Sequence, residues 1–241
     1  MDNQDILIQN ELIEEKTVEI EVEAEVEDKI LYWPQLNDYF DIDRQYRQLM
    51  FIYEAAISQL EARLEILNRE FQFSNDRNPI ENVKSRIKSK SSIVEKLRKK
   101  GLPMTVSSLT NHVLDIAGLR IICPFISDVY QIARMILQQR DVELLKIKDY
   151  IQEPKENGYR SLHLIVRVEV PFAERVRKVP VEIQIRTIAM NFWASTEHQL
   201  RYKKDRKFTG EMQLRLKHCA DIMAEADREM QEIAGGLSEE Y

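Results

Sequence analysis

Residues 181–187, Val-Glu-Ile-Gln-Ile-Arg-Thr, constrain the fold more than any other part of the chain. Apolar and polar side chains alternate along this segment, and alternate residues of a β-strand face opposite sides of a sheet. Glu182, Gln184 and Arg186 therefore share one face of the predicted strand, and aliphatic residues form the other. Burying such a row of polar groups without partners is costly. The segment therefore predicts a buried strand with a functional polar face.

Two upstream segments carry chemistry that matches this strand. Residues 157–163 present an aromatic ring after a glycine and then enter an apolar run, and residues 115–120 begin another apolar run with an aspartate. Two carboxylates, several cations and one exposed ring suit a site for a metal-bound phosphate and a flat base.

Bulk properties favour a single folded body with an acidic tail. The chain has 241 residues and a net charge of −6, but residues 1–30 alone carry −9, which leaves +3 for the rest. We expect residues 1–30 to be a solvated, disordered tail, although the valine–glutamate alternation within them also fits an edge strand. Residues 31–241 are expected to form one domain.

Location is predicted from what the sequence lacks. It contains no apolar run of membrane-spanning length and no secretory signal pattern. Its two cysteines, Cys123 and Cys219, lie far apart, which argues against a structural zinc site or a disulfide framework. These features predict a cytoplasmic protein.

Apolar periodicity predicts helices interleaved with strands, and hence an α/β or α+β fold. Expected helices begin near Tyr46, at a capping box with Ser92 as N-cap, and at residues 127 and 188. Gly101 is expected to end the second of these helices. The expected strands are residues 118–123, 142–147, 161–170 and 180–186.

A final helix is predicted by apolar residues that recur every four and three positions, and Gly235-Gly236 are expected to end it. This seam fits either an oligomer interface or ordinary packing on the sheet. It consists of Met212, Leu216, Cys219, Met223, Ala226, Met230 and Ile233.

The cations and carboxylates each allow a functional and a structural interpretation. The basic residues 84–100 suit a loop and helix N-terminus that hold a polyphosphate, but a solvated charged face is the commoner meaning of such a run. Asp115 suits Mg²⁺ or a turn cap. Glu182 suits the same metal or a buried salt bridge with Arg120 or Arg186.

Two ring side chains also leave alternatives open. Tyr159 suits a stacking surface for a base or a tyrosine folded back onto the sheet. His163, in an apolar run, is more often a core group than a ligand. The sequence contains no P-loop, no dinucleotide-binding glycine motif, no kinase catalytic loop and no nucleophile elbow. A site for ATP would therefore be built from separate cations and carboxylates.

Taken in order, residues 86–96, 115–120, 157–163 and 182–187 resemble the successive synthetase motifs of the stringent-response alarmone synthetases, the RelA/SpoT synthetase family. The resemblance covers about residues 43–234, and no His-Asp hydrolase motif precedes it. The chain is thus similar to the stand-alone small alarmone synthetases of Firmicutes.

The resemblance implies a nucleotidyltransferase-like mixed β-sheet flanked by helices. It implies transfer of pyrophosphate from ATP to the 3′-hydroxyl of GDP or GTP, with Mg²⁺ as cofactor and a homotetramer as the assembly. Asp115 and Glu182 match the metal-associated carboxylates, and Glu182 the candidate base. The remaining matches are Arg86, Lys88, Lys96 and Arg120 for ATP, Lys155, Asn157, Tyr159 and His163 for the acceptor, and, with no assigned role, Gln184 and Arg186.

Other functions stay open at this stage. An adenine nucleotide or an RNA 3′ end would also stack on Tyr159, because stacking accepts any base. A non-catalytic nucleotide- or RNA-binding module would explain the basic residues 84–100 but not the carboxylates. The sequence also leaves open whether GDP or GTP is preferred, and whether RNA, an alarmone or a metal ion regulates the protein.

Overall fold

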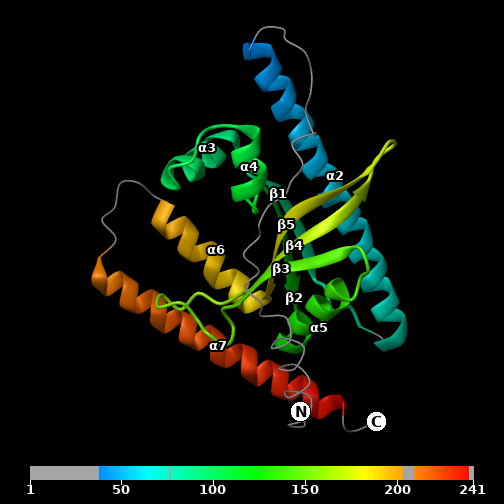
Figure 1. Cartoon of the computed structure of the whole chain (residues 1–241). Coiled ribbons are helices and arrows are strands. Elements are labelled where there is room, and N and C mark those ends of the chain that lie inside the picture. The colour runs from blue at the N-terminus through cyan, green and yellow to red at the C-terminus, as the bar shows by residue number, and fades with distance from the viewer. Residues whose placement is uncertain (1–37, 76, 203–208, 239–241) are drawn as a thin grey trace.

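A computed structural model describes residues 38–75, 77–202 and 209–238. Helices and strands are interleaved along the described chain, which closes with two helices (Figure 1). The elements are α2 (Asp38–Asn75), β1 (Asn82–Ile87), α3 (Lys90–Lys99), α4 (Val106–His112), β2 (Ala117–Cys123), α5 (Ile126–Leu137), β3 (Val142–Asp149), β4 (Leu162–Pro171), β5 (Val176–Thr187), α6 (Ile188–Tyr202) and α7 (Gly210–Ser238).

The acidic residues 1–30, predicted to be a tail, lie outside the described residues. None of the described helices is both long enough and apolar enough to span a membrane.

Five strands form one sheet in the order β1-β2-β5-β4-β3. β2 and β5 pair in parallel, and the other neighbours pair antiparallel. This mixed sheet flanked by helices confirms the predicted fold class. Because β2 and β5 are adjacent, the segment that follows Asp115 lies beside the segment that contains Glu182.

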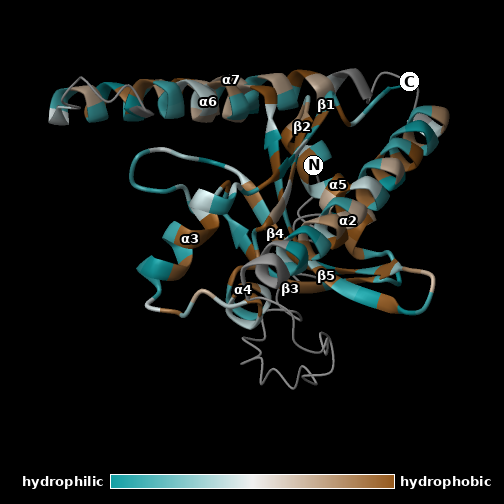
Figure 2. Cartoon of the chain, turned by 90° about the horizontal axis from the view of Figure 1, so that it is seen from above, coloured by the Kyte–Doolittle hydropathy of each residue, from teal (hydrophilic) through white to brown (hydrophobic). Residues whose placement is uncertain are grey.

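One face of the sheet is apolar and is covered by α2 and α5. Leu119 of β2 and Ile183 and Ile185 of β5 are almost completely buried, as are Tyr53 and Leu60 of α2. Burying an aliphatic or aromatic side chain of this size contributes roughly 1.5–3 kcal/mol. In Figure 2 hydrophobic and hydrophilic residues are interspersed along α2 and α7, as in amphipathic helices. The apolar face thus anchors the sheet and leaves its other face for polar groups.

The segment around Arg86 is a strand, and the prediction of a basic loop there was wrong. β1 pairs antiparallel with β2 and forms an edge of the sheet. Its mostly exposed polar residues give no alternating apolar signal. Charged residues such as Lys84 and Arg86 are common on edge strands, where they hinder pairing with further chains. Pairing with β2, which periodicity does not report, decided the structure of this segment.

The N-cap of α3 is Ser89 rather than the predicted Ser92. The Ser89 hydroxyl accepts a hydrogen bond from the Ser92 amide at 3.3 Å, and Ser89 has the extended backbone of a cap residue. Gly101 ends this helix as predicted, with a positive φ of 67°. The short helix α4 was not predicted, because its seven residues carry too little apolar periodicity.

α7 continues to Ser238, so the prediction that Gly235-Gly236 end it was wrong. Two glycines within a helix cost about 2 kcal/mol in propensity. The helix is docked just before them, because Gln231 accepts a hydrogen bond from the backbone amide of Ser127 in α5 at 2.8 Å. Tertiary contact therefore outweighs the local preference to end.

Candidate active site

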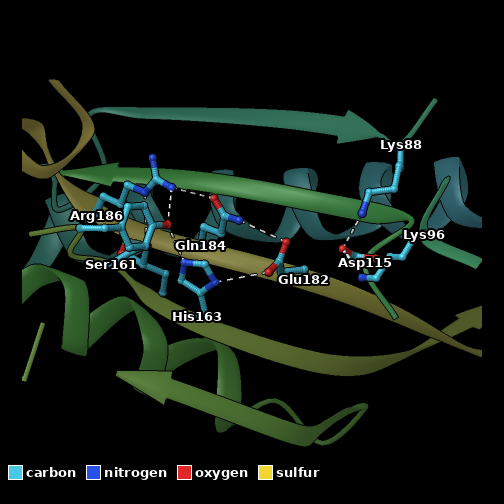
Figure 3. Close-up of polar contacts among 10 residues, drawn as sticks. Lys88, Lys96, Asp115, Ser161, His163, Glu182, Gln184 and Arg186 are labelled. Carbon is cyan, nitrogen blue, oxygen red and sulfur yellow. Dashed lines mark hydrogen bonds and ion pairs between the residues drawn. The ribbon is translucent and has the colours of Figure 1, made fainter. Parts of the chain in front are cut away.

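Strand register brings the predicted polar residues onto one face of the sheet. Gln184 of β5 lies opposite Arg120 of β2 and His163 of β4. Glu182 and Arg186 stand two residues before and after Gln184 and share its face. Both of them hydrogen-bond to Gln184, which confirms the predicted polar row on this strand (Figure 3).

A first chain of contacts joins Glu182 to Arg186 through two rings. Glu182 Oε1 lies 3.3 Å from His163 Nδ1. His163 Nε2 lies 2.7 Å from the Tyr159 hydroxyl, which also accepts a hydrogen bond from Arg186 Nη2 at 2.6 Å. Tyr159 is therefore held against the sheet by its hydroxyl, while its ring is half-buried.

A second chain runs through Gln184 and closes a ring of five residues. Arg186 Nη2 donates to Gln184 Oε1 at 3.0 Å, and Gln184 Nε2 donates to Glu182 Oε2 at 3.1 Å. Glu182 is thus hydrogen-bonded to His163 and Gln184, and Arg186 is connected to Glu182 through these neighbours. Burial raises the pKa of Glu182, but the hydrogen bond and electrostatic attraction from His163, with the hydrogen bond from Gln184, outweigh burial and lower that pKa below its ordinary value.

Asp115 sits in the turn before β2, held by two lysines. Its Oδ2 atom lies 2.5 Å from Lys88 Nζ and 2.7 Å from Lys96 Nζ. Burial by itself raises the pKa of Asp115, but the hydrogen bonds and charges of the two lysines together lower it. Asp115 also raises the pKa of Glu182, so the two carboxylates repel each other across the site.

Two buried polar atoms at this site make no hydrogen bond among the described residues: Asp115 Oδ1 and Arg120 Nε. Buried polar groups without partners are rare, and each one calls for an explanation such as a bound ligand or ion. Burial, and next the neighbouring charge of Arg186, lower the pKa of Arg120, although an arginine remains protonated. The site thus offers one free acceptor just before β2, on Asp115, and one free donor within β2, on Arg120.

The basic residues predicted to hold phosphate separate into two groups. Lys88 and Lys96 turn inward onto Asp115, whereas Arg86, Arg98 and Lys99 are exposed, as a solvated charged face would be. Arg86 lies on β1, close enough to Arg120 to contribute to the lowering of its pKa.

The loop between β3 and β4 carries the other predicted residues. Lys155 Nζ lies 4.6 Å from the ring centroid of Tyr150 and 4.9 Å from that of Tyr159. Asn157 Oδ1 accepts a hydrogen bond from the Tyr159 amide at 3.2 Å, and Gly158 between them has a φ of 88°. Asn157 therefore shapes the turn that presents Tyr159, a role that only the local geometry reveals.

α7 supports this loop from below, and the sequence did not predict that contact (Figure 1). A Cβ atom on Gly158 would stand 2.4 Å from Ala220 Cβ of α7. Trp193 of α6 donates its indole N–H to the Leu216 carbonyl of α7 at 2.8 Å. Trp193, Leu216 and Ala220 pack together beside Tyr159 and Met223.

Asp227 of α7 is a further buried polar residue that sequence reasoning missed. Its Oδ2 accepts a hydrogen bond from Thr187 Oγ1 at 2.7 Å, and Thr187 is the residue that follows Arg186. Burial raises the pKa of Asp227. Asp227 lies beside the predicted apolar seam rather than in it, on the face of α7 that also buries Ala220 and Ala224.

Among the described residues, no group of three or more His, Cys, Asp or Glu side chains is arranged to hold a metal ion. Mg²⁺ often binds through one or two carboxylates, with phosphate oxygens and water as its other ligands. Asp115 and Glu182, with a free Oδ1 atom on the former, fit that limited role. The fold and this arrangement of carboxylates and cations are suited to a protein that binds a nucleotide polyphosphate.

Comparison with known proteins narrows this class to one family. Residues 85–207 match the family described as "Region found in RelA / SpoT proteins". The chain is 43% identical over 195 residues to the GTP pyrophosphokinase YwaC of Bacillus subtilis, an alignment that covers 81% of this chain and 93% of that protein. This chain therefore belongs to the RelA/SpoT family.

Solved structures of small alarmone synthetase 1 from Bacillus subtilis share the fold. The structure bound to its product pppGpp has a TM-score of 0.73 and 37% identity, and covers 80% of this chain and 98% of its own. The structure bound to AMPCPP has a TM-score of 0.68 and 34% identity, and covers 81% and 99% respectively.

Proposed function

We propose that this chain is a GTP pyrophosphokinase, which transfers pyrophosphate from ATP to the 3′-hydroxyl of GDP or GTP and releases AMP. The products are the alarmones ppGpp and pppGpp. The observation that carries the proposal is the placement of two carboxylates, Asp115 and Glu182, beside adjacent central strands within a family of such enzymes. Phosphoryl transfer needs positioning and charge neutralisation more than covalent help, and this site supplies both.

ATP is assigned to the side of the site that carries Asp115. Lys88 and Lys96 now share one oxygen of Asp115 and could move a short distance onto the phosphates of ATP. Arg86 and Arg120, on neighbouring strands, would flank the adenine. The unpaired Nε of Arg120 supports this role, because a ligand there would complete its hydrogen bonding.

Mg²⁺ is assigned to Asp115 and Glu182. The free Oδ1 atom of Asp115 and the repulsion between the two carboxylates support this assignment, since a cation would relieve both. Bound there, Mg²⁺ would neutralise polyphosphate charge and make the acceptor hydroxyl easier to deprotonate.

The acceptor is assigned to the side that carries Tyr159. A guanine would stack on the Tyr159 ring, and Lys155, Asn157 and His163 surround that ring or its turn. Glu182 would orient the 3′-hydroxyl and accept its proton. The lowered pKa of Glu182 keeps it ionised, as a base must be.

The test is to incubate the protein with Mg²⁺, ATP labelled in the γ-phosphate, and either GDP or GTP. Label on a guanosine tetra- or pentaphosphate, with AMP released, is the expected result and also gives the acceptor preference. Transfer to ADP, ATP or tRNA in preference to guanine nucleotides would point to another acceptor. RNA binding that weakens with salt, with no AMP formed, would point to a binding module.

A homotetramer built through α7 is the proposed assembly. Met212, Met230 and Ile233 of the predicted seam are 44%, 57% and 58% exposed, and they form an apolar stripe that is not covered within one chain. Leu216 and Met223 instead pack inward near Trp193. One part of the predicted seam therefore packs within the chain, and the exposed part is available for an oligomer interface. The cytoplasm, where ATP and guanine nucleotides are available, is the proposed location.

A further inference from the structure

A hydrogen bond of fixed direction links Arg186 to the Tyr159 hydroxyl. A guanidinium donates and cannot accept, so the Tyr159 oxygen accepts from Arg186 Nη2 at 2.6 Å. The same hydroxyl lies 2.7 Å from His163 Nε2, so a second hydrogen bond links it to the imidazole. The other ring nitrogen, Nδ1, lies 3.3 Å from Glu182 Oε1 and donates to it, because a carboxylate only accepts.

In the second chain the direction of both hydrogen bonds is fixed. Gln184 must accept through Oε1 from Arg186 Nη2, which leaves its Nε2 group to donate to Glu182 Oε2. Both chains begin at Arg186, and each ends on a different oxygen of Glu182. A carboxylate held at both oxygens cannot rotate about its terminal bond without breaking one of the two chains.

The two ends of this network differ in burial. Arg186 is only 4% exposed, and its Nε donates to Ser161 Oγ at 3.3 Å. Ser161 is fully buried and donates in turn to the Ile185 carbonyl. The side chain of Glu182 is 24% exposed, at the open end of the row. The fixed end is thus the guanidinium, and the end that can meet a ligand is the carboxylate.

We propose that Arg186 is a positioning residue, which sets the orientation of the Glu182 carboxylate through Tyr159–His163 on one side and Gln184 on the other. The inference rests on the proposed function, in which Glu182 meets the acceptor hydroxyl. In this role Arg186 acts through its hydrogen-bonded neighbours and not on a substrate. Tyr159 then has two separable roles. Its ring stacks the base, and its hydroxyl connects Arg186 to His163 by hydrogen bonds and so fixes the orientation of the imidazole.

The test separates kcat from KM in three variants. Tyr159→Phe keeps the ring but cuts the first chain, and Gln184→Met cuts the second at similar volume. Each should lower kcat about tenfold, the factor for one hydrogen bond to a charged group, with the acceptor KM changed less than about threefold. Arg186→Lys keeps the charge but loses the planar fork, and should lower kcat at least as far as either.

Non-additivity supplies the second readout. Tyr159→Phe added to Arg186→Lys should cause little further loss, because the first chain has already lost its origin. Arg167→Lys, on β4 and paired with the exposed Glu143, is the matched control and should keep wild-type kcat. Thermal unfolding of every variant checks that the fold is intact, and Tyr159→Phe and Gln184→Met carry the test if Arg186→Lys does not fold.

Normal kcat in both Tyr159→Phe and Gln184→Met would overturn the proposal, as would an effect confined to the acceptor KM. Full additivity of Tyr159→Phe with Arg186→Lys would also contradict it. Failure of the proposed function is a different result, because wild type would then transfer no pyrophosphate to a guanine nucleotide.

Discussion

Asp115 and Glu182 are held by different kinds of partner. Two ammonium groups neutralise Asp115, whereas an imidazole and an amide orient Glu182. Removing either charge should therefore leave the fold intact and stop the reaction. Asp115→Asn and Glu182→Gln are each expected to lower kcat by about 10²–10⁴, the range for loss of a general base or comparable group.

Steady-state transfer of labelled pyrophosphate measures this effect. Glu143→Gln, an exposed carboxylate on β3 of the same sheet, is the control and should retain wild-type kcat. Near-normal turnover in Asp115→Asn or Glu182→Gln would remove that residue from the proposed metal site.

Tyr159 is expected to act mainly through its ring in acceptor binding. Stacking of a base on an aromatic ring is worth about 1–3 kcal/mol, so Tyr159→Ala should raise the acceptor KM about 5- to 150-fold. The KM for ATP should change little, because ATP is assigned to the side of Asp115. An unchanged acceptor KM in Tyr159→Ala would argue against stacking on this residue.

At the level of elements, α7 holds the acceptor loop in place. Gly158 has a positive φ and no room for a Cβ atom against Ala220. Gly158→Ala should therefore shift the loop, raise the acceptor KM about tenfold or more, and lower the melting temperature. Gly210→Ala, where a Cβ meets nothing within 4 Å, is the matched control. Equal behaviour of the two variants would show that the close approach to α7 is unimportant.

The link between α7 and β5 should depend on pH. Burial raises the pKa of Asp227, so the folded protein binds its proton more tightly than the unfolded chain does. The stability that protonated Asp227 contributes is complete below its unfolded pKa and is lost as pH rises through the raised folded pKa. Asp227→Asn does not titrate and can still accept from Thr187.

Asp227→Asn should therefore gain stability relative to wild type as pH rises from about 4 to 7. Urea unfolding at several pH values measures this difference. A variant that becomes less stable than wild type over the same rise would show that Asp227 is needed in its ionised form.

At the level of the whole molecule, the exposed stripe of α7 should control assembly. Met230→Glu with Ile233→Glu places two charges in an apolar interface and should convert a tetramer to smaller species. Light scattering after size exclusion measures the mass. Ile66→Glu, an equally exposed aliphatic residue on α2, is the control and should leave the mass unchanged. A wild-type mass equal to one chain would refute the tetramer directly.

Strands with clear alternation were predictable from the sequence, because period-two patterning depends only on which side chains face the core. β2, β4 and the polar row of β5 lie where that pattern placed them. Three elements were not predictable in this way. β1 is fixed by pairing with β2 and the end of α7 by the contact of Gln231 with α5, and both depend on residues remote in sequence. α4 is fixed by a short local hydrogen bond at its cap residue, Thr105.

The sequence by itself determined which residue types gather at the site, because the spacing and the order of the motifs can be read directly from the chain. Only the tertiary structure decided how they are connected. Parallel pairing of β2 with β5 places Arg120 beside Gln184. The turn at Gly158, which packs against α7, brings Tyr159 to Arg186. Hydrogen-bond direction and burial arise from this packing, and they, rather than residue identity, distinguish a group that meets substrate from one that orients it.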